Sequence, residues 1–158
     1  MLMNGQQYIE SLKKMRPNIY KFGKLIEDVT TDPNTALHIK SVVRSYDACF
    51  DPERAPIYTY KSALSGEIAH RWNTLQDSME AQIGNAKMKR DQYHQTGTCQ
   101  GATCAGWTAL NSLYDTAFEC DAALGTQYLP RVKNFMKFVE DNALALAGAI
   151  TDAKGDRS

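Results

Sequence analysis

Residues 96–121 read TGTCQGATCAGWTALNSLYDTAFECD, and the rest of the chain is organised around this stretch. Large apolar side chains recur in it at helical spacing, at Trp107, Leu110, Tyr114, Ala117 and Phe118. A second stripe of mostly smaller residues follows the same period, at Gly106, Ala109, Leu113 and Cys120. A helix that is apolar on two faces is usually buried on two faces. The pattern therefore predicts a central core helix, preceded by a polar turn rich in Gly and Thr.

The composition is that of an ordinary globular domain. The chain has 158 residues, 43% hydrophobic and 23% charged, enough for one domain with its own core. Eighteen Lys and Arg balance eighteen Asp and Glu, so no net field favours nucleic acid or an anionic membrane as a partner. No apolar run approaches the roughly 20 residues of a membrane span, and the first residues lack a signal-peptide pattern. Four cysteines do not make a secreted disulfide framework, so we expect a cytoplasmic protein with reduced thiols.

Apolar periodicity predicts helices in five further places, at residues 4–15, 33–50, 62–75, 78–95 and 126–140. Asn4 with Gln7, and Asp77 with Glu80, have the spacing of a capping box. Between the first two helices, residues 19–29 predict an extended or hairpin-like segment. The class is therefore mostly α.

The end of the chain has a different pattern. Leucine, glycine and isoleucine alternate with alanine over residues 143–150, which predicts a strand with one face kept small. We expect residues 1–142 to form a helical domain, and residues 143–158 to form a strand and a loop that lead into a β domain outside this chain.

Two cysteines beside the central helix are candidate metal ligands. Cys99 and Cys104 are five residues apart, which on a regular helix is about 140° of rotation, so they do not face one metal ion from one regular helix. They do so only if Cys99 precedes the helix or a π-bulge intervenes. Zinc is disfavoured, because there is no second cysteine pair at matching spacing and there are only three histidines, His38, His70 and His94. Taken alone, the two thiols have the pattern of ordinary small core residues.

The closing residues 148–157 read GAITDAKGDR. A strand that ends in a polar loop with Thr, Lys, Gly and Arg can offer backbone N–H groups and cations to a phosphate or to the edge of a flavin ring. The glycine spacing of a Walker loop or a dinucleotide fingerprint is missing. By itself, the pattern is typical of a plain turn.

Taken together, these two segments resemble a known family. The chain is similar to the N-terminal domain of the flavoproteins that include 4-hydroxybutyryl-CoA dehydratase/vinylacetyl-CoA Δ-isomerase and 4-hydroxyphenylacetate 3-hydroxylase. The resemblance rests on residues 7–12, Thr98-Cys99, Cys104 with Gly106, residues 125–128 and, above all, residues 148–157. It implies an acyl-CoA-dehydrogenase-like fold, in which a helical N-terminal domain precedes a middle β domain and a C-terminal helical bundle, assembled as a homotetramer around FAD.

The resemblance also implies roles for individual residues. The family's loop at this position contacts FAD, here with Ile150, Thr151, Asp152, Lys154, Gly155, Asp156 and Arg157. In the dehydratase branch, two cysteines matched by Cys99 and Cys104 hold a [4Fe-4S] cluster, together with a His and a Cys from later in the polypeptide. The cluster acts as a Lewis acid beside the flavin, which removes an unactivated β-hydrogen by a radical route. Gln100 matches a polar residue between the family's cysteines and is the candidate catalytic residue.

Three hypotheses stay open. The match is closer to the dehydratase branch, which acts on a short acyl-CoA, but that branch has three residues between its cysteines where this chain has four. The hydroxylase branch acts on a small aromatic substrate, typically has an Arg and a Tyr at these positions, and needs no cluster. In both cases the active enzyme includes the rest of the same polypeptide, and this part alone is inactive. The third hypothesis is a helical fragment without catalysis.

Overall fold

The computed structural model describes residues 2–15, 18–98, 101–147 and 155, and it describes residues 101–104 by their backbone only. Helices predominate in these residues. The α-helices are α1 (Gly5–Lys14), α2 (Ala36–Ala48), α3 (Ala55–Tyr58), α4 (Met79–Thr96), α5 (Gly101–Leu124) and α6 (Tyr128–Asp141). Two antiparallel hairpins join them, β1 (Tyr20–Lys21) with β2 (Lys24–Leu25), and β3 (Thr59–Lys61) with β4 (Ile68–His70). One turn of 3-10 helix, η1 (Arg71–Asn73), follows β4. The predicted mostly helical class is confirmed.

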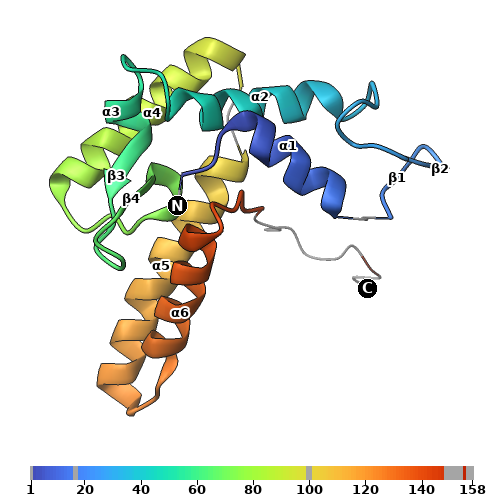
Figure 1. The fold of residues 1–158 in the computed structure, drawn as a ribbon. Coiled ribbons are helices and arrows are strands. Elements are labelled where there is room, and N and C mark those ends of the chain that lie inside the picture. Colours follow the sequence, from blue (N-terminus) through green and yellow to red (C-terminus); the bar gives the residue numbers. More distant parts are fainter. Residues whose placement is uncertain (1, 16–17, 99–100, 148–154, 156–158) are drawn as a thin grey trace.

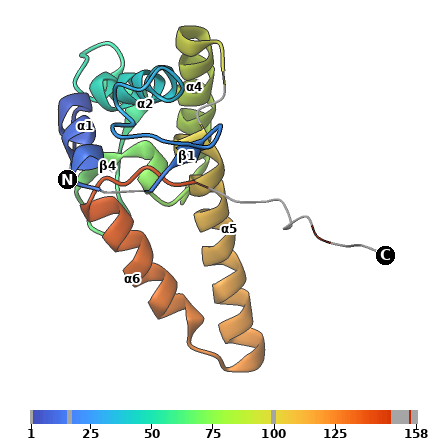
Figure 2. The same ribbon diagram turned by 90° about the vertical axis from the view of Figure 1, so that its right-hand side faces the viewer.

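The long helices α5 and α6 form an antiparallel pair that extends away from the other elements (Figure 1). The remaining helices and the β3–β4 hairpin lie at the end of this pair that holds the first turns of α5 and the last turns of α6, whereas the β1–β2 hairpin lies away from α5, beyond α1 and α2 (Figure 1 and Figure 2). At that end η1 contacts both α5 and α6. None of the helices in the described ranges combines the length and the hydropathy that a transmembrane span requires.

Two apolar clusters stabilise this arrangement. The first joins α2, η1, α4 and α5 and contains the fully buried Tyr46, Trp72, Met88 and Trp107. The second lies between α5 and α6, with Leu110 and Ala117 of α5 packed against side chains of α6. Both tryptophans are therefore core residues.

Several predicted boundaries are confirmed, and each depends on a local interaction. The Asn4 side chain accepts from Gln7 N while the Gln7 side chain accepts from Asn4 N, each at 2.9 Å, which completes the capping box of α1. Gly97 ends α4 with a φ of +66°, a conformation that favours glycine. The second predicted capping box is wrong: Ser78, not Asp77, caps α4 and accepts from Ala81 N at 3.0 Å.

The predicted helix at residues 62–75 is wrong. The segment contains a turn, then β4 and η1. Ser62 Oγ accepts from the N–H groups of Leu64 and Ser65 and donates to the buried Glu140 carboxylate of α6 at 2.6 Å, and Ser65 Oγ also donates to Glu140. Because Ser side chains offer the backbone an alternative to helical hydrogen bonds, a buried carboxylate that recruits both hydroxyls favours the turn.

The predicted strand at the end of the chain stays a prediction, because residues 144–147 pair with no strand among the described residues and residues 148–150 lie outside them. One further expectation fails in the described part of the chain. Only one face of α5 is buried against described residues, because Leu113 of the second stripe is 47% exposed and Phe118 is 60% exposed. The small-residue stripe contributes a different contact, at Gly106, which is described below.

Candidate functional site

The central helix carries one of the two predicted metal ligands. Cys104 lies in the first turn of α5, and its backbone only is described. The described part of this helix begins at Gly101. Cys99 itself and the candidate catalytic Gln100 lie outside the described residues.

The predicted flavin-contacting residues are also largely outside the described part. These are Ile150, Thr151, Asp152, Lys154, Asp156 and Arg157. Gly155 alone is described, and it is exposed. How these residues lie relative to Cys104 therefore stays a prediction.

The structure does bring the chain that leads to them, residues 143–147, into contact with the start of α5. Gly106 is buried, and a Cβ atom built on it would overlap Leu146 Cβ and lie 3.0 Å from the Leu146 carbonyl carbon and oxygen. The helix backbone and residues 143–147 (from here the 143–147 segment) are thus in direct contact, two residues after Cys104. The small residues of the second stripe predict that another backbone comes close to this helix, and the structure identifies that backbone at Gly106 as Leu146.

The 143–147 segment is also held by side chains. Ala143, with a φ of +49°, turns the chain back at the end of α6, and its buried methyl group belongs to the first core cluster. Tyr46 Oη donates to the Ala143 carbonyl at 2.7 Å, and Asn73 Nδ2 donates to the Leu144 carbonyl at 2.8 Å. Both donors are fully buried, so water does not compete with these bonds.

The residues that follow η1 are hydrogen-bonded to α5. Trp107 Nε1 and Asn111 Nδ2 of α5 both donate to the Thr74 carbonyl, and Gln76 N donates to Asn111 Oδ1 at 2.8 Å. One short stretch, residues 73–76, thereby binds the 143–147 segment on one side and α5 on the other.

A buried thiol–imidazole pair lies beside η1. Met3 N donates to His70 Nε2 at 2.9 Å, so Nδ1 carries the imidazole proton and points it at Cys49 Sγ, 3.0 Å away. Burial raises the pKa of Cys49 to about 12, so the group stays a thiol. A protonated, buried thiol is not a nucleophile, and the pair therefore has a structural role, which the sequence did not indicate.

This pair predicts a loss of stability in acid. Burial lowers the pKa of His70 to about 3, whereas a histidine in the unfolded chain titrates near about 6.5. The unfolded state then binds more protons between these values, so stability is complete at neutral pH and falls as pH drops below about 6.5. We expect a loss of about 1–2 kcal/mol between pH 7 and pH 5, measured by urea denaturation.

The matched variants separate this effect from general acid denaturation. His70→Gln should flatten the pH dependence between pH 7 and pH 5, whereas the same change at His94, which is exposed on α4, should leave it as it is. Equal pH profiles for the wild type and His70→Gln would show that His70 is not responsible.

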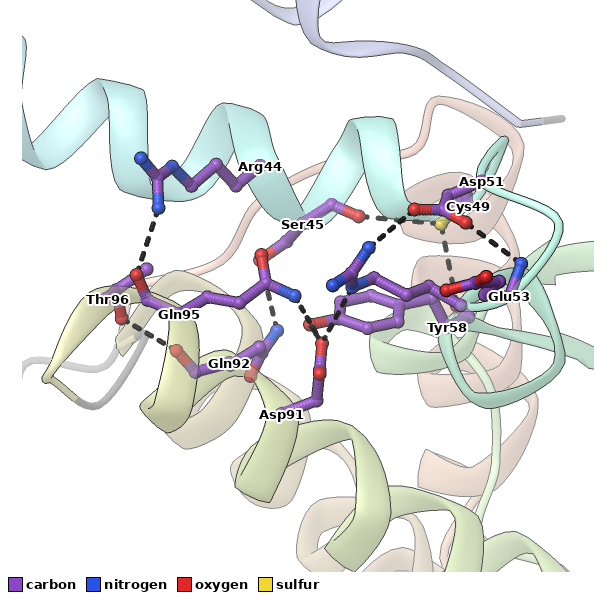
Figure 3. Close-up of polar contacts among 11 residues, drawn as sticks. Arg44, Ser45, Cys49, Asp51, Glu53, Tyr58, Asp91, Gln92, Gln95 and Thr96 are labelled. Carbon is purple, nitrogen blue, oxygen red and sulfur yellow. Dashed lines mark hydrogen bonds and ion pairs between the residues drawn. The ribbon is translucent and has the colours of Figure 1, made fainter.

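A second polar network joins α2, α3 and α4 (Figure 3). Asp91 accepts from Tyr58 Oη at 2.8 Å and from the Gln95 side chain, and Arg54 pairs with Asp51 at 2.6 Å. The hydrogen bond from the Glu53 N–H, followed by that from the Arg54 guanidinium, lowers the pKa of the Asp51 carboxyl. Each of these charged groups has a partner within the network. The role of the network is therefore to fix the last turns of α4, which precede Cys99 and Cys104 in the chain.

The described residues contain no group of three or more His, Cys, Asp or Glu side chains placed to hold a metal ion. An iron–sulfur cluster of the [4Fe-4S] type takes about four protein ligands, and Cys99 with Cys104 supply two at most.

Comparison with known proteins gives a consistent assignment. The family model described as "4-hydroxyphenylacetate 3-hydroxylase N terminal" matches residues 4–158. A 4-hydroxybutyryl-CoA dehydratase/vinylacetyl-CoA-Delta-isomerase of Clostridium aminobutyricum is 36% identical over 157 residues, covering 99% of this chain and 32% of that protein.

Solved structures agree with this match. An oxygen-tolerant archaeal 4-hydroxybutyryl-CoA dehydratase from N. maritimus superposes with a TM-score of 0.91 at 34% identity, over 99% of this chain and 31% of that one. The oxygenase component of 4-hydroxyphenylacetate 3-monooxygenase in complex with FAD has a TM-score of 0.68 at 22% identity, over 90% of this chain and 29% of that one, which shows a shared fold. The chain spans about a third of the length of these relatives. It belongs to the 4-hydroxyphenylacetate 3-hydroxylase N-terminal family.

Proposed function

We propose that this chain is the N-terminal part of a FAD-dependent enzyme of the 4-hydroxybutyryl-CoA dehydratase/vinylacetyl-CoA isomerase type. The observation that carries the proposal is the similarity to the dehydratase over nearly the whole chain, in sequence at 36% identity and in structure at a TM-score of 0.91. The monooxygenase oxygenase component has the same fold at lower similarity. The substrate would be a short acyl-CoA, and the rest of the same polypeptide would complete the active site.

The proposed roles follow the family resemblance. Residues 150–157 would contact FAD, and Cys99 and Cys104 would bind iron, with Gln100 between them as the catalytic polar residue. The contact between Gly106 and Leu146 supports this assignment, because it brings the chain that leads to residues 150–157 against the helix turn that carries Cys104. When bound, the flavin supplies one-electron chemistry and the cluster supplies a Lewis acid.

A second candidate is a flavin-dependent aromatic hydroxylase. It is favoured by the four residues between Cys99 and Cys104, which differ from the dehydratase spacing, and by the FAD complex of the 4-hydroxyphenylacetate 3-monooxygenase oxygenase component. In that case the thiols would be packing residues and the substrate a small phenol. We further propose, for either enzyme, a cytoplasmic homotetramer of which this chain alone is inactive.

The deciding experiment is an anaerobic UV–visible spectrum, with flavin, iron and sulfide analysis, of the product of the complete reading frame that encodes this chain. Flavin with about four irons per subunit supports the dehydratase. Flavin without iron supports the hydroxylase. Absence of both cofactors contradicts either enzyme and leaves a fragment without catalysis.

A further inference from the structure

The position of the 143–147 segment is set by three contacts from separate parts of the chain. The Ala143 carbonyl is bound by Tyr46 of α2, the Leu144 carbonyl by Asn73 of η1, and Leu146 rests on Gly106 of α5. Leu144 N also donates to the Val139 carbonyl at 3.0 Å, which joins the segment to α6. No strand ladder contributes in the described residues, so these contacts, together with the packing of Ala143, Leu144 and Leu146 against the two apolar clusters, hold the segment there.

The Gly106 contact leaves no room for adjustment. Two of the three atoms that a Cβ at this position would meet belong to the Leu146 backbone, and the third is its Cβ. A side chain here cannot be accommodated by rotation of a flexible neighbour, so either the segment or the helix must move. The contact therefore fixes the distance between the 143–147 segment and the α5 turn that carries Cys104.

We propose that Gly106 and Asn73 are positioning residues that set where the chain leaves this domain relative to the first turn of α5. Ile150 follows Leu146 by four residues, which span at most about 14 Å, so a displacement at Leu146 moves the point from which residues 150–157 must reach FAD. The inference rests on the proposed function, in which those residues contact FAD. It deepens that function by naming two residues, far in the sequence from residues 150–157, that determine the affinity for FAD.

The test uses Gly106→Ala in the product of the complete reading frame, with FAD as the probe in a fluorescence titration of the apoprotein. We expect the Kd for FAD to rise about tenfold or more. The matched control is Gly5→Ala, another buried helical glycine, whose Cβ would lie 2.5 Å from Val43 Cγ1 and 2.8 Å from Asp47 Oδ1. None of the three atoms nearest to that Cβ belongs to the 143–147 segment or to η1, and we expect the Kd of this variant to stay within about twofold of wild type even where its thermal midpoint falls.

Asn73→Ala is the second variant, for the case that Gly106→Ala does not fold. The substitution removes the donor to the Leu144 carbonyl, which destabilises the fold. It also removes a buried Oδ1 that lacks a hydrogen-bond partner among the described residues, which offsets part of that loss. We therefore expect a small change in stability. A weaker FAD affinity at unchanged thermal midpoint supports the inference. Equal FAD affinity of wild type and variant overturns it, as does an equal loss in Gly106→Ala and Gly5→Ala. If the wild type binds no FAD, the proposed function itself fails.

Discussion

Replacing Trp107 with alanine is expected to lower the free energy of unfolding by about 3–5 kcal/mol, as large-to-small changes in a core do. Trp107 is 1% exposed and belongs to the first core cluster, where Tyr46 and Trp72 are fully buried. The substitution also leaves the buried Thr74 carbonyl without its indole donor. Urea denaturation followed by circular dichroism measures the difference.

Phe118→Ala is the matched control, because Phe118 is an aromatic residue of the same helix that is 60% exposed. We expect its cost to stay near or below about 0.5 kcal/mol. Similar losses for Trp107→Ala and Phe118→Ala would mean that α5 is buried on both sides in solution, as its sequence pattern predicts. A negligible loss for Trp107→Ala would contradict the core described here.

Replacing Cys99 or Cys104 with alanine in the product of the complete reading frame is expected to abolish bound iron and sulfide. The proposed cluster takes about four protein ligands, and loss of one thiolate opens it to solvent and to disassembly. Iron and sulfide analysis after anaerobic purification, with the visible absorbance of the cluster, measures the result. Flavin content should stay unchanged in both variants, since the proposed flavin contacts lie at residues 150–157.

Cys120→Ala is the control for this prediction. Cys120 is a free, half-buried thiol of the same helix α5, and it lies outside the segments on which the family resemblance rests. We expect its iron content to equal that of the wild type. Loss of iron from Cys104→Ala but not from Cys99→Ala would show that the additional residue between the two cysteines removes Cys99 from the ligand set.

The sequence alone determined the elements whose ends depend on neighbouring residues. The capping box of Asn4 and Gln7 spans three residues, and Gly97 and Gly125, with φ values of +66° and +65°, stand at the ends of α4 and α5. Pro130 lies in the first turn of α6, as predicted, where a missing N–H costs nothing. Such interactions act within one helical turn, so a pattern in the sequence reports them directly.

The tertiary structure alone decided the segments whose polar groups find partners far along the chain. Ser62 bonds to Glu140 across 78 residues, and this long-range bond makes a turn of a stretch whose pattern predicts a helix. The alternation at residues 143–147 predicts a strand, yet Tyr46 and Asn73, 97 and 71 residues away, hold its first two carbonyls. A backbone carbonyl accepts a buried side-chain donor as readily as a strand N–H, and which donor reaches it depends on how the helices pack. For the same reason, the contact between Gly106 and Leu146 exists only once α5 and α6 have come together.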